Sequence, residues 1–275
     1  MEVPGLAVGP LMTALPQQII PQVSSVQAVL KSHLGRNLRA IHLFGSAVDG
    51  GLKPGSDIDL MVSITDPLAE PVRRALMTDL LAHSAWPGSS DTLRALEVTV
   101  VALGEIVPWR YPPRREMQFG EWLREDIEAG RFEPALVDHD LAILITKLRR
   151  HSSALLGPSA AELFEEVPRS DFRRSLLDTI AQWNEEPDWL GEERNILLAL
   201  ARIWFSACTG DIVSKDVAAA WAAQRLPPTC RSLMERAAAA YLGGGEDEPA
   251  WARMPVAETI HFCKDEIERA LKRAQ

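Results

Sequence analysis

Three segments in the first part of the chain are apolar or alternate between apolar and polar residues, and each predicts a β-strand. They cover residues 38–44, 57–64 and 94–102. Apolar positions at helical spacing lie before, between and after them, and they predict helices at 17–33, 69–83, 121–129 and 138–151. Strands that alternate with helices predict an α/β domain with a mixed sheet and flanking helices.

Strand patterns stop at about residue 168, and only helical spacing follows. It predicts helices at 171–184, 192–208, 214–223, 230–242 and 255–274. We therefore predict two domains, residues 1–167 and residues 168–275, the second an all-α helical bundle. Residues 1–16 contain three prolines and are expected to form a loose arm, while the Pro- and Arg-rich residues 104–118 are expected to form a loop.

Composition narrows the class of protein. The chain has 275 residues, is 47% hydrophobic and carries a formal net charge of −9. That charge argues against a nucleic-acid partner, whose phosphates require Lys and Arg. The three cysteines form no CxxC pair, which is typical of reduced thiols. No signal peptide or membrane-spanning run is apparent, so we expect a cytoplasmic protein without a membrane partner, acting as a monomer.

Candidate chemistry begins with two carboxylates on the second predicted strand. Side chains alternate faces along a strand, so Asp57 and Asp59 point to one side while Ile58 points into a core. Two neighbouring carboxylates repel each other unless a cation lies between them, and Mg²⁺ prefers oxygen ligands of this kind. The first strand ends in Gly45-Ser46, where the backbone can approach a phosphate closely and a hydroxyl can bind it.

Glu97 is an isolated acid within the apolar third strand. A buried charge without a partner is unfavourable, so a glutamate at this position requires a structural or functional explanation. Placed opposite Asp57 and Asp59, Glu97 would complete a three-carboxylate cluster and act as a general base. Each motif alone has a simpler interpretation, a turn for Gly-Ser and a solvated strand face for Asp-x-Asp. Their combination in this order favours a catalytic site.

Gly45-Ser46 and Asp57-Ile58-Asp59 match the signature of the DNA polymerase β-like nucleotidyltransferase superfamily. Seven stretches resemble the aminoglycoside (3″)(9) adenylyltransferases more narrowly, at 38–48, 51–54, 93–101, 115–127, 200–204, 214–216 and 240–243. The resemblance implies a nucleotidyltransferase domain followed by a helical domain that closes the ATP and drug cleft. It also implies Mg²⁺-dependent transfer of AMP from ATP to a hydroxyl of spectinomycin, streptomycin or both, which releases pyrophosphate and confers antibiotic resistance.

The resemblance also implies roles for single residues. Asp57 and Asp59 would hold Mg²⁺, as two ions, and Glu97 would activate the drug hydroxyl. ATP would be the co-substrate, and its implied contacts are Gly45, Ser46, Ser56, Asp140, Asn195, Arg202, Lys215 and Tyr241. The implied drug contacts are Glu97, Trp122, Trp183, Asp188 and Glu192, acids and indole rings that suit cationic drugs. Without the resemblance, Lys215 is an exposed helix residue and Trp183 a core residue.

Two positions depart from the family pattern. Family members carry Asp where Glu192 stands and His where Asn195 stands. Glu is longer by one methylene and Asn cannot become cationic, so spectinomycin is better supported as a substrate than streptomycin. Two alternatives remain: adenylylation of another hydroxyl, on a lincosamide or a protein, and a non-catalytic partner module with the nucleotidyltransferase fold.

Overall fold

The computed structural model describes residues 15–244, 251 and 254–273, and all but the end of the arm expected at 1–16 lies outside them. The chain divides into two compact units. The first holds the chain up to Leu52 together with Ser56–Val137 and Leu148–Glu166, and the second holds Lys53–Gly55, Asp138–Lys147 and the chain from Val167 onward. A functional boundary after residue 167 stays a prediction.

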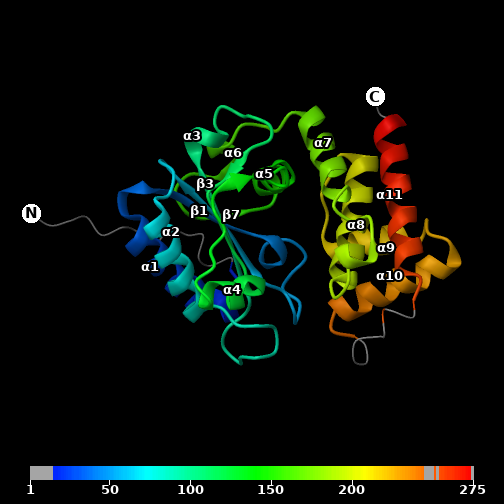
Figure 1. Cartoon of the computed structure of the whole chain (residues 1–275), viewed down its shortest axis with the longest axis horizontal. Coiled ribbons are helices and arrows are strands. Elements are labelled where there is room, and N and C mark those ends of the chain that lie inside the picture. The colour runs from blue at the N-terminus through cyan, green and yellow to red at the C-terminus, as the bar shows by residue number, and fades with distance from the viewer. Residues whose placement is uncertain (1–14, 245–250, 252–253, 274–275) are drawn as a thin grey trace, which may run out of the picture. The chain divides into compact units, whose positions relative to one another are not determined.

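A five-stranded mixed sheet forms the first unit (Figure 1). Its order is β5-β3-β2-β1-β7, with β2 and β3 parallel and the other neighbours antiparallel. The strands are β1 (Leu38–Phe44), β2 (Ile58–Ile64), β3 (Leu96–Ala102), β5 (Met117–Phe119) and β7 (Ser153–Leu156). A separate pair joins β4 (Arg114–Arg115) to β6 (Leu136–Val137). The predicted mixed sheet is confirmed.

One face of this sheet is the core of the first unit. Leu43, Leu60 and Val98 are fully buried there and pack with apolar residues of three helices, α1 (Ile20–Leu34), α2 (Glu70–Leu80) and α4 (Arg124–Glu128). Short helices complete the unit: η2 (Gln17–Ile19), η3 (Gly35–Asn37), η4 (Gly45–Ala47), η5 (Leu81–His83), α3 (Leu103–Ile106), η6 (Glu121–Leu123) and α6 (Ala160–Leu163). The opposite face therefore remains for the polar residues of the strands.

The second unit is helical, as predicted. Its long elements are α7 (Arg169–Ile180), α8 (Glu193–Thr209), α9 (Lys215–Ala223), α10 (Pro228–Tyr241) and α11 (Val256–Arg273), with η7 (Glu186–Asp188) between α7 and α8. Helix α8 packs against α9, α10 and α11 and is the centre of this bundle. Helix α5 (Leu141–Arg150) begins in this unit and ends in the first. Among the helices described, none is long and apolar enough to cross a membrane.

Two sequence-based expectations for the first unit are wrong. Residues 104–118 are not simply a loop, because they contain most of α3, all of β4 and two residues of β5. Strand β7 was not expected at all. Both β5 and β7 are short and lie at the edges of the sheet. A strand of three or four residues shows too few alternations for its periodicity to be recognised.

Candidate active site

Asp59 and Glu97 lie side by side on the polar face of the sheet. They are direct partners in the parallel ladder between β2 and β3. Asp57 lies directly before β2, and Asp59 is the second residue of that strand. The two aspartates are thus two residues apart and share a face. All three acids are half-buried, whereas Ile58 between the aspartates is fully buried. The backbone therefore brings the three carboxylates to one end of two neighbouring strands.

Gly45 makes room for the Asp59 carboxylate. It follows β1, whose last residue, Phe44, pairs with Asp59 across the sheet. A Cβ atom added to Gly45 would lie 1.7 Å from Asp59 Oδ2, and the Gly45 φ of +70° is in the left-handed region. Glycine meets both constraints without strain and without moving the Asp59 carboxylate. Ser46 follows directly in η4 and is half-buried.

The expected three-carboxylate cluster is not assembled here. In the part of the chain that the structure describes, no three His, Cys, Asp or Glu side chains are placed to hold a metal ion. One cause is visible at Glu97, whose Oε1 accepts a hydrogen bond of 3.1 Å from Gln118 Nε2 on β5. Strand β5 lies on the far side of β3 from the aspartates. Asp57 and Asp59 therefore remain as the proposed metal ligands and Glu97 as the proposed base.

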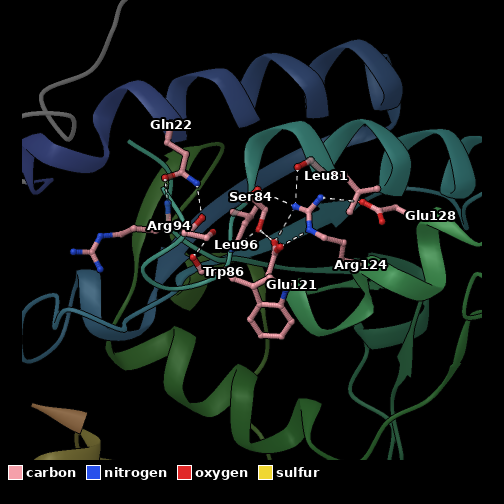
Figure 2. Close-up of polar contacts among 10 residues, drawn as sticks. Gln22, Leu81, Ser84, Trp86, Arg94, Leu96, Glu121, Arg124 and Glu128 are labelled. Carbon is pink, nitrogen blue, oxygen red and sulfur yellow. Dashed lines mark hydrogen bonds and ion pairs between the residues drawn. The ribbon is translucent and has the colours of Figure 1, made fainter. Parts of the chain in front are cut away.

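Arg94 supports the segment that carries Asp57. Its Nη1 donates a hydrogen bond of 3.0 Å to the carbonyl oxygen of Ser56, whose side chain is buried. Gln22 on α1 holds the Arg94 main chain in turn, because its Nε2 donates to the Arg94 carbonyl and its Oε1 accepts from the Arg94 amide (Figure 2). Ser56 is thus fixed through its main chain directly before the two aspartates.

A buried ion pair fixes the start of β3 and the turn that carries Trp122. Glu121 is 2% exposed and pairs with Arg124, while it accepts a hydrogen bond from the Ser84 hydroxyl (Figure 2). That hydroxyl accepts from the Leu96 amide at 3.0 Å, next to Glu97. The pKa of Arg124 is raised, chiefly by its hydrogen bond to Glu121. This network was not predicted from the sequence.

Trp122 lies on the Glu97 side of the sheet. In the β3–β5 ladder Val98 pairs with Phe119, so one further step along the same register places Gly120 opposite Glu97. Opposite residues of an antiparallel pair point to the same face. A Cβ on Gly120 would lie 2.2 Å from the Trp122 ring, so the ring covers Gly120 on that face. Trp122 is 52% exposed, which leaves indole surface available to a ligand.

His42 is the remaining ionisable residue that β1 directs to this face. It is fully buried, and its Nε2 donates a hydrogen bond to the Pro158 carbonyl. Burial lowers the pKa of its imidazole. A neutral buried ring is unsuited to binding phosphate, so His42 is a structural residue.

In the helical unit, the structure brings two of the predicted ATP contacts together. Lys215 begins α9 and Tyr241 ends α10, and the Lys215 ammonium lies 5.4 Å from the centre of the Tyr241 ring. This distance is typical of a cation–π contact. Asn195 and Arg202 lie seven residues apart on α8, so they share one face of that helix.

Hydrogen bonds from nearby residues fix two predicted drug contacts of this unit. Glu192 precedes α8, and its Oε2 accepts a hydrogen bond of 2.7 Å from Asn195 Nδ2. Asp188 Oδ2 accepts from the main-chain amides of Asn184 and Glu185 at 2.7 and 2.9 Å. These hydrogen bonds lower the pKa of the Asp188 carboxyl and keep it ionised. Both acids can therefore attract a cationic ligand.

Trp183 and Asp140 complete the set. The half-buried Trp183 accepts a hydrogen bond at its carbonyl from Lys264 on α11, at 2.5 Å. Asp140 is exposed, accepts from the Thr179 hydroxyl and lies 3.4 Å from His139 Nε2. Asp140 thus has a local structural role whether or not it contacts ATP.

Comparison with known proteins identifies the family. Residues 25–125 match the model of the nucleotidyltransferase domain, and residues 162–266 match that of the aminoglycoside adenylyltransferase C-terminal domain. Over 254 residues the chain is 54% identical to an aminoglycoside (3″)(9) adenylyltransferase of Escherichia coli, covering 92% of this chain and 97% of the relative. The chain belongs to the aminoglycoside adenylyltransferases.

More distant members of the family agree with this assignment. A spectinomycin 9-adenylyltransferase of Staphylococcus aureus is 38% identical over 243 residues, which cover 88% of this chain and 93% of the relative. The crystal structure of the spectinomycin adenyltransferase AAD(9) from Enterococcus faecialis, with ATP and spectinomycin, superposes with a TM-score of 0.84 at 31% identity. The match covers 90% of this chain and 98% of that one. The expected nucleotidyltransferase fold with a helical C-terminal region is confirmed.

The sequence did not identify Gln118 as a residue of the site. It lies in the segment expected to be a loop, yet it is only 7% exposed and contacts Glu97. The alternation of Met117, Gln118 and Phe119 is the sequence signal for a strand at this position. It covers only three residues, so the preceding prolines led to the prediction of a loop.

Proposed function

We propose that this adenylyltransferase transfers the AMP moiety of ATP to a hydroxyl of spectinomycin, streptomycin or both, and releases pyrophosphate. One observation carries the proposal: Glu97 and Asp59 are direct neighbours on the polar face of the sheet, beside a glycine whose missing side chain leaves room for the Asp59 carboxylate. The relatives that match nearly the whole chain are named for this drug class. They do not favour a lincosamide, a protein substrate or a non-catalytic module.

Glu97 is the proposed general base. As a carboxylate it accepts the proton of the drug hydroxyl while the hydroxyl oxygen bonds to the α-phosphorus of ATP. The bond between that phosphorus and the oxygen bridging to the β-phosphate breaks, so pyrophosphate leaves with the electron pair. Gly45 and Ser46, at the end of β1, lie beside Asp59 and are proposed to contact the phosphates. Ser56 is the further proposed contact on this side.

Mg²⁺ fits the aspartate pair. Asp57 and Asp59 supply hard oxygen ligands from one strand face, and Asp59 Oδ2 occupies the space that a side chain on Gly45 would fill. When bound, Mg²⁺, proposed as two ions, supplies positive charge that neutralises the triphosphate. The aspartates themselves would hold the ions.

The helical unit is proposed to supply cations to ATP and anions to the drug. Lys215 and Arg202 suit the triphosphate, Tyr241 and Asn195 suit the nucleoside, and Asp140 is the weakest of these candidates because Thr179 and His139 already contact it. On the drug side, Asp188 and Glu192 suit guanidinium and amine groups, and the Trp122 and Trp183 rings suit sugar rings and cations. The net charge of −9 favours such a cationic substrate over nucleic acid. We propose a cytoplasmic monomer.

Pyrophosphate release tests this proposal. The full chain is incubated with Mg²⁺ and ATP, and with spectinomycin, streptomycin, a lincosamide or no acceptor. We expect release with spectinomycin at least, and a product heavier than the drug by one adenylyl group in mass spectrometry. Release that is equal with and without every acceptor, or a lincosamide product alone, would contradict the proposal.

A further inference from the structure

We propose that Gln118 is a positioning residue that holds Glu97 as an oriented carboxylate, an inference that rests on the proposed role of Glu97 as base. Gln118 lies on β5 and Glu97 on β3, and Gln118 Nε2 donates to Glu97 Oε1 at 3.1 Å. Gln118 is 7% exposed, so water does not compete freely for this hydrogen bond.

Two further contacts fix which end of the Gln118 amide faces Glu97. Arg115 Nη1 donates to Gln118 Oε1 at 3.2 Å, and the Thr99 hydroxyl donates to the same oxygen at 2.9 Å. A guanidinium can only donate hydrogen bonds, so the amide oxygen must face Arg115. The amide nitrogen then faces Glu97 and presents an N–H there. A flipped amide would place two donors against each other at Arg115.

This polarity determines how Glu97 is held. The Gln118 N–H occupies Glu97 Oε1, and the amide cannot turn because its own oxygen accepts from Arg115 and Thr99. A general base must meet the hydroxyl in a defined direction, and small displacements of a catalytic group are costly. Gln118 therefore fixes the orientation of the base.

A double-mutant cycle on the full chain tests this proposal, with kcat and KM measured for turnover of ATP and spectinomycin. For Gln118→Met we expect kcat to fall about tenfold, as for loss of a hydrogen bond to a charged group, with KM for ATP within about twofold of wild type. In a Glu97→Gln background, Gln118→Met should have almost no further effect.

The matched control is Gln22→Met. Gln22 is also a buried glutamine, 5% exposed, with hydrogen bonds of 2.8, 2.9 and 3.1 Å, but all of them go to main chain of His83 and Arg94. We expect it to lower the melting temperature without coupling to Glu97, so that any loss of kcat is equal in the wild-type and Glu97→Gln backgrounds. Gln118→Glu preserves the size of the side chain and its contacts with Arg115 and Thr99 but removes the N–H that faces Glu97, so its kcat should fall at least as far as that of Gln118→Met. It serves also where the methionine variant does not fold.

The outcomes separate the two proposals. An inactive Glu97→Gln, together with kcat near wild type in both Gln118 variants, would overturn the role of Gln118 alone. An equal loss from Gln118→Met with and without Glu97 would do the same, because it would indicate a purely structural effect. Turnover near wild type in Glu97→Gln alone would overturn the base and the positioning role together.

Discussion

The sheet unit and the helical unit place their candidate residues by different means. In the sheet, Asp59 and Glu97 are neighbours because their strands pair in register, and Gly45 lies under Asp59 for the same reason. In the helical unit, Asp188 and Glu192 depend on hydrogen bonds from nearby residues. We propose that the sheet determines whether the reaction proceeds, and that Asp188 and Glu192 of the helical unit influence which drug is used.

The largest effect is expected from Gly45→Ala. The added Cβ would occupy the position of Asp59 Oδ2, so the carboxylate must move from its proposed metal-binding place. We expect kcat with every drug to fall roughly a thousandfold, since small displacements of catalytic groups and lost electrostatic stabilisation are both costly. Steady-state pyrophosphate release with spectinomycin and streptomycin measures this.

Gly88→Ala is the control for backbone strain. Gly88 has a φ of +83°, but an added Cβ would meet nothing within 4 Å. We expect a loss of about 1 kcal/mol in unfolding free energy and unchanged kcat. If both alanine variants lost turnover equally, the close approach of Gly45 to Asp59 would have no special role.

A stability effect of intermediate size is expected from Arg124→Met. The change leaves the Glu121 carboxylate, 3% exposed, without its ion-pair partner. We expect a loss of about 3 kcal/mol in unfolding free energy, measured by urea denaturation. The kcat of the folded fraction should fall much less than in Gly45→Ala, because Arg124 supports the turn of Trp122 and does not contact the carboxylates of the reaction.

Arg131→Met provides the comparison for that measurement. Arg131 pairs with Asp126 at 2.5 Å, but both side chains are more than half exposed, at 66% and 52%. An exposed pair contributes about 0.5 kcal/mol or less. Equal losses in the two variants would show that burial of Glu121 is not what makes its ion pair important.

The smallest effect is expected at the helical unit, and it should be selective. Glu192→Asp shortens the reach of the carboxylate by one methylene toward the length that resemblance to the family implies for streptomycin. We expect kcat/KM for streptomycin to rise about tenfold, with spectinomycin within about twofold. Glu186→Asp, at an exposed position of η7, should change neither. Equal changes for both drugs at Glu192 would contradict the division of roles between the units.

The periodicity of apolar residues in the sequence predicted most of the longer strands and helices. Three strands, the long helices and the change to an all-helical second part were expected, because 7-residue strands and 9- to 18-residue helices repeat their pattern several times. Asp57, Asp59 and Glu97 were expected on one face of the sheet, because alternation along a strand fixes the face of every residue.

What the sequence did not predict depends on contacts between distant residues. Gln118 reaches Glu97 from a strand of three residues, and Glu121 is joined to Ser84 across 37 residues of chain. Neither contact produces a periodic pattern in the sequence.

Glu97→Gln tests most directly whether the sheet determines the reaction. The amide keeps the size of the side chain but cannot accept the proton. We expect calorimetry to give ATP affinity in Mg²⁺ close to wild type, while spectinomycin-dependent pyrophosphate release falls by roughly two or more orders of magnitude. Pyrophosphate release near the wild-type rate would contradict the account.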